Sequence, residues 1–331
     1  MSNINDVADR AGVSAMTVSR YFNDPGAVAP STQERVEEAV EALRYVPNAA
    51  ARSLVQGETQ MVAAVLSDIT NPFFTKLARG IEDVAQERGY TLFIGNTDES
   101  LAKEKHYMKT LIARQTDGLL LSPSGENDHL GELQQHGIPF VLIDRKIPDV
   151  RADVVRGDSF AGGSLLTEHL IEQGYRDVAF LGGKPGVSSL RDRLAGYRAV
   201  MEEARLEPQV VLGEYTRESG EQILEGLIEE GAIPKAIVAA NNLVAVGALR
   251  ALRRHGYQVP RDAALVCFED LELAAMMDPF LTVVDQPSYE MGRSAMQILL
   301  GRLQGETDPP REEVFPVELV VRRSSPRASS S

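Results

Sequence analysis

The chain has 331 residues, a length that accommodates two or three compact units at roughly 100–200 residues per domain. Its 43% hydrophobic and 25% charged residues are ordinary for a globular protein and exclude the collagen-like, coiled-coil and wholly disordered classes. One cysteine excludes an internal disulfide and a CxxC metal site, and the net charge of −14 argues against nucleic acid unless a local face departs from it.

The first 57 residues are predicted to form short helices joined by turns, at 4–11, 15–23 and 31–43. The first helix shows apolar side chains at helical spacing, and Gly12 follows it as a typical C-terminal residue. Ser14 stands where an N-cap is expected for the second helix. Ser31 and Glu34 form a capping box that predicts the start of the third helix.

From Met61 onward the pattern changes to alternating strands and helices. Strands are predicted at 61–67, 91–95, 118–121, 140–143, 178–181, 210–212, 236–240, 264–268, 281–284 and 314–321. Helices are predicted at 73–88, 102–114, 129–136, 159–173, 191–204, 218–230, 243–255 and 288–304. Such alternation predicts parallel sheets with right-handed crossovers. Two groups of units, before and after about residue 160, predict two doubly wound subdomains with a cleft between them.

Signals for an enzyme are weak. The sequence has no GxGxxG after its first strand, no GxxxxGK[ST] loop and no HExxH. The run Gly182–Gly186 follows a predicted strand, but Pro185 and the missing Ser or Thr favour a turn over a phosphate loop. The five histidines show no metal spacing. We therefore expect no catalytic residue, no metal and no cofactor.

The most specific local pattern spans residues 6–20, DVADRAGVSAMTVSR. It reads as a helix, a tight turn centred on glycine and a second helix, which is helix-turn-helix geometry. The second helix presents short or hydrogen-bonding side chains suited to a major groove: Ala15, Met16, Thr17, Ser19 and Arg20. The alternative is a generic helical pair without a binding role.

Several longer segments extend this pattern along the chain. They are DVADRAGVSAMTVSRYFN (6–23), VAPSTQERVEEAVEALRYVPN (28–48), NAAARSLVQG (48–57), DITNPFF (68–74), RLAGY (193–197), ANNLVAVGA (240–248) and DQP (285–287). Taken in order over about residues 3–323, they resemble the lactose-repressor (LacI/GalR) family of bacterial transcription regulators.

The resemblance implies an all-α helix-turn-helix headpiece at 1–47 and a hinge helix with its linker at 48–58. An α/β effector domain similar to periplasmic binding proteins would follow at 59–323. It would consist of two doubly wound subdomains with crossovers near 158–162 and 285–290. We expect residues 324–331, rich in Ser, to be a disordered tail.

The resemblance also implies a homodimer on a pseudo-palindromic operator. By motif position, Ala15, Met16 and Arg20 would read base edges, while Thr17 and Ser19 would contact bases or phosphate. In the hinge, Asn48, Ala51 and Leu54 match DNA-binding positions, and Leu54 would be a minor-groove wedge. One feature departs from the expectation: residues 1–57 hold five Arg, no Lys and seven acidic residues, so we expect a modest salt dependence.

For a small-molecule effector, the resemblance points to nine positions in the cleft: Phe73, Phe74, Asp144, Arg145, Arg193, Tyr215, Asn241, Asp270 and Gln286. Aromatic caps facing acids, an Asn and an Arg suit a sugar, whereas Arg145 beside Asp144 would favour a sugar acid.

The sequence thus predicts a transcription regulator, a repressor switched by a sugar or sugar acid, and not an enzyme. One alternative is a solute-binding protein of sugar transport, and another is a sugar-modifying enzyme on the same scaffold. Because no secretory signal or apolar run of membrane-spanning length is present, we expect a cytoplasmic protein without a membrane partner.

Overall fold

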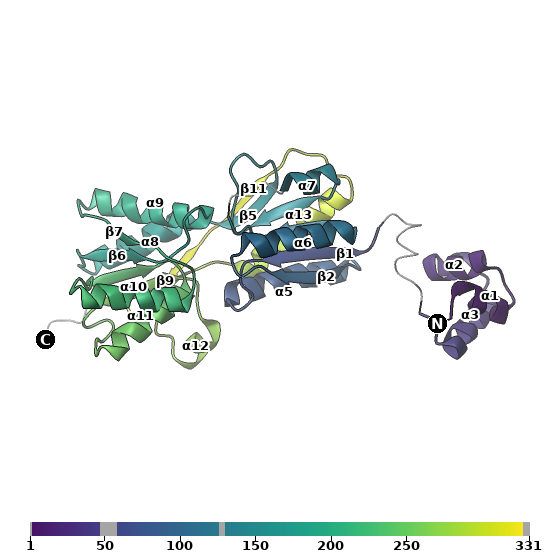
Figure 1. The fold of residues 1–331 in the computed structure, drawn as a ribbon, viewed down its shortest axis with the longest axis horizontal. Helices are drawn as coiled ribbons and strands as arrows, with labels where there is room; N and C mark the ends of the chain where they lie inside the picture. Colours follow the sequence, from purple (N-terminus) through teal and green to yellow (C-terminus); the bar gives the residue numbers. More distant parts are fainter. Residues whose placement is uncertain (1, 47–57, 126–129, 327–331) are drawn as a thin grey trace. The chain divides into compact units, whose positions relative to one another are not determined.

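The computed structural model describes residues 2–46, 58–125 and 130–326. The chain divides into two compact units, Met1–Thr59 and Gln60–Ser331 (Figure 1). Within the described ranges, no helix combines the length and apolar character needed to cross a membrane.

The amino-terminal unit is built from α1 (Ile4–Ala11), α2 (Ala15–Asn23), a 3-10 turn η1 (Pro25–Ala27) and α3 (Pro30–Leu43). Gly12 ends α1 in the left-handed conformation at φ 63°, and the Ser14 side chain caps α2, as the sequence predicts. The capping box predicted for the third helix is wrong. This helix begins at Pro30, whose fixed φ suits a first helical position, and no side chain caps it.

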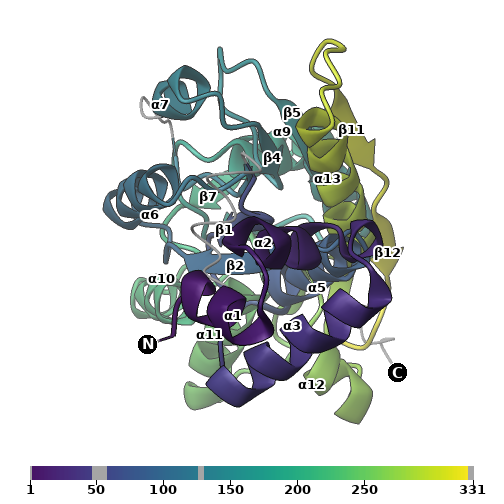
Figure 2. The same ribbon diagram turned by 90° about the vertical axis from the view of Figure 1, so that its right-hand side faces the viewer.

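The second unit contains two six-stranded sheets, each forming the centre of one lobe. The amino-terminal lobe has strand order β11-β5-β4-β3-β1-β2, and only parallel pairs occur in it. Its elements are β1 (Met61–Leu66), α5 (Pro72–Glu87), β2 (Thr91–Asn96), α6 (Leu101–Ala113), β3 (Gly118–Leu121), α7 (Leu130–Gln135), β4 (Phe140–Ile143), β5 (Asp153–Gly157), α13 (Ser288–Leu303) and β11 (Glu312–Phe315). Figure 2 shows α6 and α7 on one side of this sheet and α5 and α13 on the other.

The carboxy-terminal lobe has strand order β12-β10-β9-β8-β6-β7, with only β12 antiparallel. Its elements are α8 (Ser159–Glu172), β6 (Val178–Leu181), α9 (Ser188–Glu203), β7 (Gln209–Val211), α10 (Arg217–Glu229), β8 (Ala236–Ala239), α11 (Asn242–Arg254), β9 (Ala264–Phe268), α12 (Glu272–Met277), β10 (Thr282–Asp285) and β12 (Glu318–Val320). Alternating strand residues point to opposite faces, where α8 and α9 cover one core and α10 and α11 the other.

Three crossovers join the lobes: β5 to α8, β10 to α13, and β11 to β12. The sequence predicts only the first two. It places one strand at 314–321, whereas the structure has two strands there, each in a different sheet. Pro316 separates them, because a proline cannot donate a ladder hydrogen bond. The short strand β5 and helix α12 are also absent from the predicted elements.

The expected disordered tail starts too early. Ser324 and Ser325 are fully buried against the carboxy-terminal lobe. The Ser324 hydroxyl donates to the carbonyl of Leu265 at 2.5 Å, and the Ser325 hydroxyl lies 2.7 Å from Nε2 of His169. A run of serines in the sequence predicts a flexible tail. In the structure, the first two of these serines are instead packed against the carboxy-terminal lobe.

Glycines allow helices of this unit to approach each other closely in pairs. In the pair α8–α9, a Cβ added to Gly163 would fall 2.1 Å from the carbonyl oxygen of Arg193. One added to Gly196 would fall 2.2 Å from that of Phe160. The pairs α5–α13 and α10–α11 show the same reciprocal arrangement, so backbone packs directly on backbone in all three.

Candidate functional site

The second helix of the amino-terminal unit presents a free face. Its buried side is anchored by Val18, which has no exposed surface. The predicted DNA-reading residues all lie on α2 outside that core: Ala15, Thr17 and Ser19 are half-buried, and Met16 and Arg20 are exposed. Met16 is 72% exposed, which is unusual for so large an apolar side chain. The face is therefore apolar at its start and cationic at its end.

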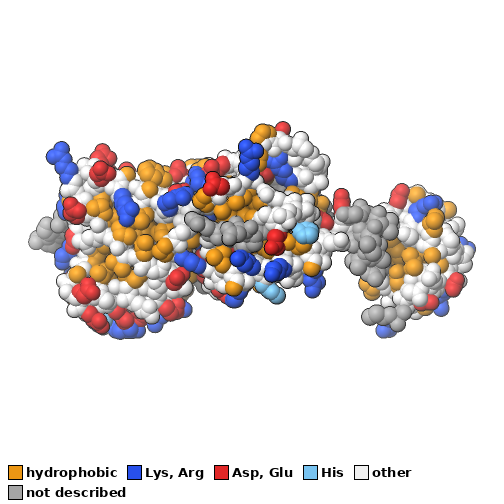
Figure 3. Space-filling view, turned by 45° about the horizontal axis from the view of Figure 1, so that its top comes forward, with side chains coloured by type: hydrophobic (Ala, Val, Ile, Leu, Met, Phe, Trp, Pro, Cys, Tyr) orange, Lys and Arg blue, Asp and Glu red, His pale blue; other side chains and the backbone are white. Residues whose placement is uncertain are grey.

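Charges of both signs are interspersed on the amino-terminal unit, as Figure 3 shows for the face it draws. Helix α3 carries four exposed carboxylates at helical spacing, Glu34, Glu37, Glu38 and Glu41. The unit therefore has few cations to attract the DNA backbone without regard to sequence. The prediction that DNA affinity depends only modestly on salt concentration stays a prediction. Asn48, Ala51 and Leu54 lie outside the described residues.

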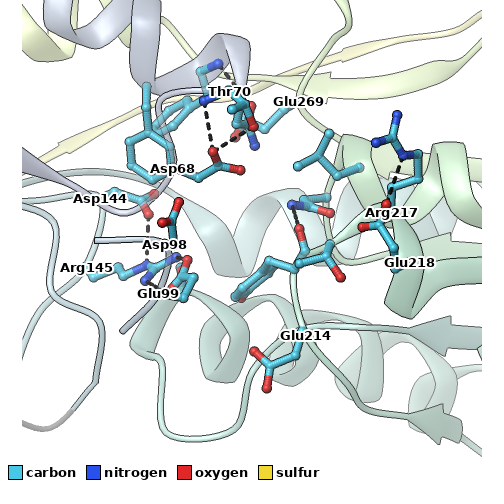
Figure 4. A pocket seen from close by; sticks show the side chains of 18 of the residues that line it. Asp68, Thr70, Asp98, Glu99, Asp144, Arg145, Glu214, Arg217, Glu218 and Glu269 are labelled. Carbon is cyan, nitrogen blue, oxygen red and sulfur yellow. Dashed lines mark hydrogen bonds and ion pairs between the residues drawn. The ribbon is translucent and has the colours of Figure 1, made fainter. Parts of the chain in front are cut away.

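A cleft with a volume of about 710 Å³ lies between the two lobes of the second unit. Seven of the nine predicted effector positions line it: Phe73, Phe74, Asp144, Arg145, Arg193, Tyr215 and Asn241. Its carboxylates come from both lobes and are Asp68, Asp98, Glu99, Asp144, Glu214, Glu218 and Glu269, all labelled in Figure 4. Against these seven acids the lining has three cations, Arg145, Arg193 and Arg217.

The two lobes contribute one buried acid each at equivalent places. Asp144 follows β4 directly and Glu269 follows β9 directly, so both stand at the carboxyl ends of parallel strands. Both adopt the left-handed backbone conformation, with φ of 65° and 68°. Such a conformation is costly for a residue other than glycine and is concentrated at functional sites. Both residues line the cleft, so the surrounding fold maintains this backbone conformation at a candidate site.

Arg145 is clamped by acids of its own lobe. Its Nη1 and Nη2 donate to the Glu99 carboxylate at 2.7 and 2.5 Å, and its Nε donates to Asp144 at 3.2 Å (Figure 4). Nη1 also donates to the carbonyl of Pro123 at 3.0 Å. Its guanidinium carbon lies 5.5 Å from the ring centroid of Tyr215 in the opposite lobe. Burial raises the pKa of Asp144, although the charges of Arg145 and Arg193 oppose the shift.

Arg193 forms the centre of the opposite wall. It donates from Nη1 to the carbonyl of Ala240 at 2.7 Å and stacks over Phe268, 4.1 Å from the ring centroid. Its Nη2 lies 3.7 Å from Oε1 of Glu269, and its buried Nε has no partner among the described residues. Burial raises the pKa of Glu269 to about 8, despite the nearby Arg193 charge. The surroundings of the Glu269 carboxyl therefore favour its neutral form.

Aromatic and amide groups complete the lining. Phe73 and Phe74 begin α5 and pack edge to face, with centroids 5.0 Å apart. Asn241 caps α11 by accepting from the Val244 amide at 2.9 Å. The Asn241 side chain also donates to the Tyr215 carbonyl at 3.2 Å, and the buried Tyr215 hydroxyl has no partner among the described residues. Two unpaired donors are thus available to a polar ligand in this cleft.

Two predicted positions do not line this cleft. Asp270 is ion-paired with Arg322, with contacts of 2.9 and 2.5 Å, and the neighbouring Glu269 takes the place in the wall. Gln286 is buried behind that wall, where its amide donates to Glu269. Sequence reasoning missed Glu99 and Glu269. Among the described residues, no cluster of His, Cys, Asp and Glu could hold a metal ion.

Comparisons with known proteins concern the family and the fold of the two units. Residues 3–48 match the model of the bacterial regulatory proteins, lacI family, and residues 167–325 match a periplasmic binding protein-like domain. A ribose operon repressor of Halalkalibacterium halodurans is 36% identical over 100% of this chain and 99% of its own. The transcriptional regulator CelR in complex with cellobiose is 32% identical, with a TM-score of 0.74 over 98% of this chain and 100% of that one. The lac repressor dimer bound to operator and the anti-inducer ONPF is 26% identical, with a TM-score of 0.85 over 98% and 99% of the two chains.

Proposed function

Because this chain belongs to the lacI family of bacterial regulatory proteins, we propose that it is a transcriptional repressor whose affinity for operator DNA is switched by a small effector in the cleft. The observation that carries the proposal is the combination of two sites in one chain. A helix-turn-helix unit exposes α2, and a separate unit encloses a polar cleft between two lobes.

The exposed face of α2 is the proposed reader of operator bases. Arg20 would donate to a guanine edge and Met16 would contact a thymine methyl group, while Ala15 permits close approach. Thr17 and Ser19 would contact bases or phosphate. In the hinge, we propose that Asn48, Ala51 and Leu54 contact the DNA, with Leu54 opening the minor groove.

A pseudo-palindromic operator requires two copies of the reader, so we propose a homodimer built through the second unit. Strand β2 is an edge strand of its sheet, and it exposes Phe93 by 40% and Ile94 by 46%. An apolar edge strand exposed to water favours pairing with another chain. The proposed interface is isologous, with this edge meeting its own copy.

The proposed effector is a sugar. The cleft offers the elements that recognise polyhydroxylated rings, which are apolar faces from Phe73 and Phe74 and buried acceptors from Asp144 and Glu269. Arg193, Asn241 and Tyr215 supply hydrogen-bond donors from the second lobe. Ligand that prefers one arrangement of the lobes shifts the population of that arrangement, and with it the affinity for DNA.

The two rival functions receive less support. The function of a solute-binding protein of sugar transport does not explain residues 3–48, which match the regulatory family. For an enzyme, the cleft has a hydroxyl on a carboxylate, since Thr70 Oγ1 donates to Oδ1 of Asp68 at 2.7 Å. The same carboxylate oxygen accepts from the Thr70 amide at 2.8 Å, so this pair is better explained as a local turn than as a nucleophile with its base. We therefore propose a regulator without catalytic activity. A protein that acts on operator DNA works in the cytoplasm, and we place this one there.

Fluorescence anisotropy tests the proposal with a labelled fragment from the promoter of the chain's own gene, titrated with and without D-ribose or cellobiose. We expect specific binding that one of the sugars changes. We also expect Arg20→Ala to lose DNA affinity while keeping sugar binding, and Arg193→Ala to do the reverse. Equal binding to random DNA would contradict the proposal.

A further inference from the structure

We propose that Glu99 sets the charge class of the effector by holding Arg145, so that the cleft accepts uncharged polyhydroxy compounds and rejects sugar acids and sugar phosphates. The inference rests on the proposed function, since it concerns the same cleft. It reverses the sugar-acid hypothesis that Arg145 suggests in the sequence.

The first step is the state of the Arg145 guanidinium. Arginine has five N–H groups, and a free guanidinium fork is the usual receptor for a carboxylate or phosphate. Here the two terminal nitrogens donate in parallel to both oxygens of Glu99, which is the geometry that an anionic ligand would need. The bonds to Asp144 and Pro123 occupy two more N–H groups. One N–H of Nη2 is left, which suffices for a hydroxyl and not for a bidentate anion.

The second step concerns the other two cations of the lining. Arg193 already donates to the Ala240 carbonyl and faces Glu269 at 3.7 Å. Arg217 is half-exposed and lies 3.4 Å from its neighbour Glu218. Arg193 keeps its Nε free, beside the Glu269 carboxyl, and Arg217 contacts Glu218 only through Nε and is exposed, so solvent screens its charge. With seven carboxylates against three guanidiniums in the lining, an entering anion meets net negative charge even if Glu269 and Asp144 are protonated.

Helix N-termini are a second possible source of anion binding. Four helices begin at the cleft, and in three of them a side chain caps one amide of the first turn. The caps are Asn71 on the Phe73 amide at 3.1 Å, Thr216 on the Ser219 amide at 3.1 Å, and Asn241 on the Val244 amide at 2.9 Å. Helix α9 has no side-chain cap, so among these four its N-terminus is the most open to an anion.

The third step is complementarity to hydroxyl groups. A sugar hydroxyl both donates and accepts, and the cleft offers both partners. The buried Nε of Arg193 and hydroxyl of Tyr215 are unpaired, while Asp144 and Glu269 provide buried oxygens. An uncharged polyol can satisfy these groups without bringing an uncompensated charge into a buried site, which would be costly.

Calorimetry with four probes tests the inference: D-ribose and cellobiose as neutral sugars, D-ribonate and D-ribose 5-phosphate as anionic relatives. We expect the wild-type protein to bind a neutral sugar and neither anion. Glu99→Gln keeps the side-chain shape and removes the charge, so Arg145 loses the carboxylate that engages both its terminal nitrogens and, of its carboxylate contacts, keeps only that of its Nε with Asp144. We expect this variant to bind an anion at least about tenfold tighter than the wild type does, with a smaller change for the neutral sugar.

Glu214→Gln is the matched control, because Glu214 lines the same cleft and does not contact Arg145. It removes the same charge, so an equal gain of anion binding in both variants would contradict the specific role of Glu99. Circular dichroism and thermal melting establish that Glu99→Gln is folded. If the variant does not fold, the titration of the wild-type protein with the four probes tests the inference by itself. An anion that binds the wild type as tightly as the neutral sugar does would overturn the inference. Failure of the wild type to bind any of the four probes contradicts the sugar effector of the proposed function instead.

Discussion

Replacing Gly163 by alanine should destabilise the second unit, although alanine is the better helix former. Gly163 lies in α8, and its added Cβ would fall 2.1 Å from the carbonyl oxygen of Arg193 in α9. Ordinary contact begins near 3.4 Å, so the two helices must separate by about 1.3 Å. The obstacle is backbone and cannot rotate away as a side chain could.

The expected magnitude follows from two opposing contributions. Overpacking a close contact costs about 1–3 kcal/mol. Glycine to alanine within a helix gains about 1 kcal/mol. The cost equals or exceeds the gain, so we expect a net loss of up to about 2 kcal/mol in the free energy of unfolding. Because the displaced carbonyl belongs to Arg193, the same change should weaken effector binding.

Gly226→Ala in α10 is the matched comparison, because an added Cβ meets no heavy atom within 4 Å. We expect this variant to be stabilised by about 0.5–1 kcal/mol. Urea denaturation of both variants and the wild type measures the two shifts, and sugar titration measures the effect on the cleft. If Gly163→Ala proved as stable as Gly226→Ala, the reasoning from backbone contact would be refuted.

Three further outcomes are expected. Arg20→Ala should weaken specific operator binding by about 1–3 kcal/mol in anisotropy titrations, and unchanged affinity and base preference would remove Arg20 from the reader. The pKa of Glu269 is raised from 4.5 to about 8, so the folded protein favours the neutral carboxyl. The contribution of this group to the free energy of unfolding is therefore full below about pH 4.5 and is lost as pH rises through about 8. Glu269→Gln should therefore gain thermal stability over the wild type with increasing pH, by at most about 1.4 kcal/mol per unit, and a constant difference across pH would contradict the raised pKa. Ile94→Asp should place a charge in the proposed β2 interface and shift the protein toward monomers in sedimentation, whereas an unchanged dimer would locate the interface elsewhere.

The amino-terminal unit could be predicted closely because its determinants are local. Gly12 and Ser14 specify the turn between α1 and α2 within a few residues, through a left-handed backbone and a side-chain cap. The two sheets were also predictable, since each buried strand is a short apolar run between helical segments. Pairing of β11 and β12 with different sheets could not be predicted, because both strands are short and only half-buried.

The position of the cleft between the two lobes could be predicted from the sequence, whereas some of the residues that line it could not. Consecutive acids follow β9, and the sequence does not reveal which one faces the ligand. The left-handed backbone of Glu269 decides this, together with Arg322, which engages Asp270 from 52 positions further along the chain. Glu99 was missed for a similar reason. Its partner Arg145 is 46 residues away, and only the packing of the loops after β2 and β4 brings the two together.

The three crossovers have a mechanical consequence for any switch in this molecule. They lie side by side: the Asp158 amide donates to the Phe315 carbonyl at 2.9 Å, and Gln286 is packed against Gly157 so tightly that a Cβ there would overlap its amide. A single strand between two bodies would leave every rotation open. Three adjacent strands form a flexure that resists torsion and sliding and yields mainly to bending. We therefore expect one bending motion to dominate the movements of the lobes, and a ligand in the cleft to act on that motion.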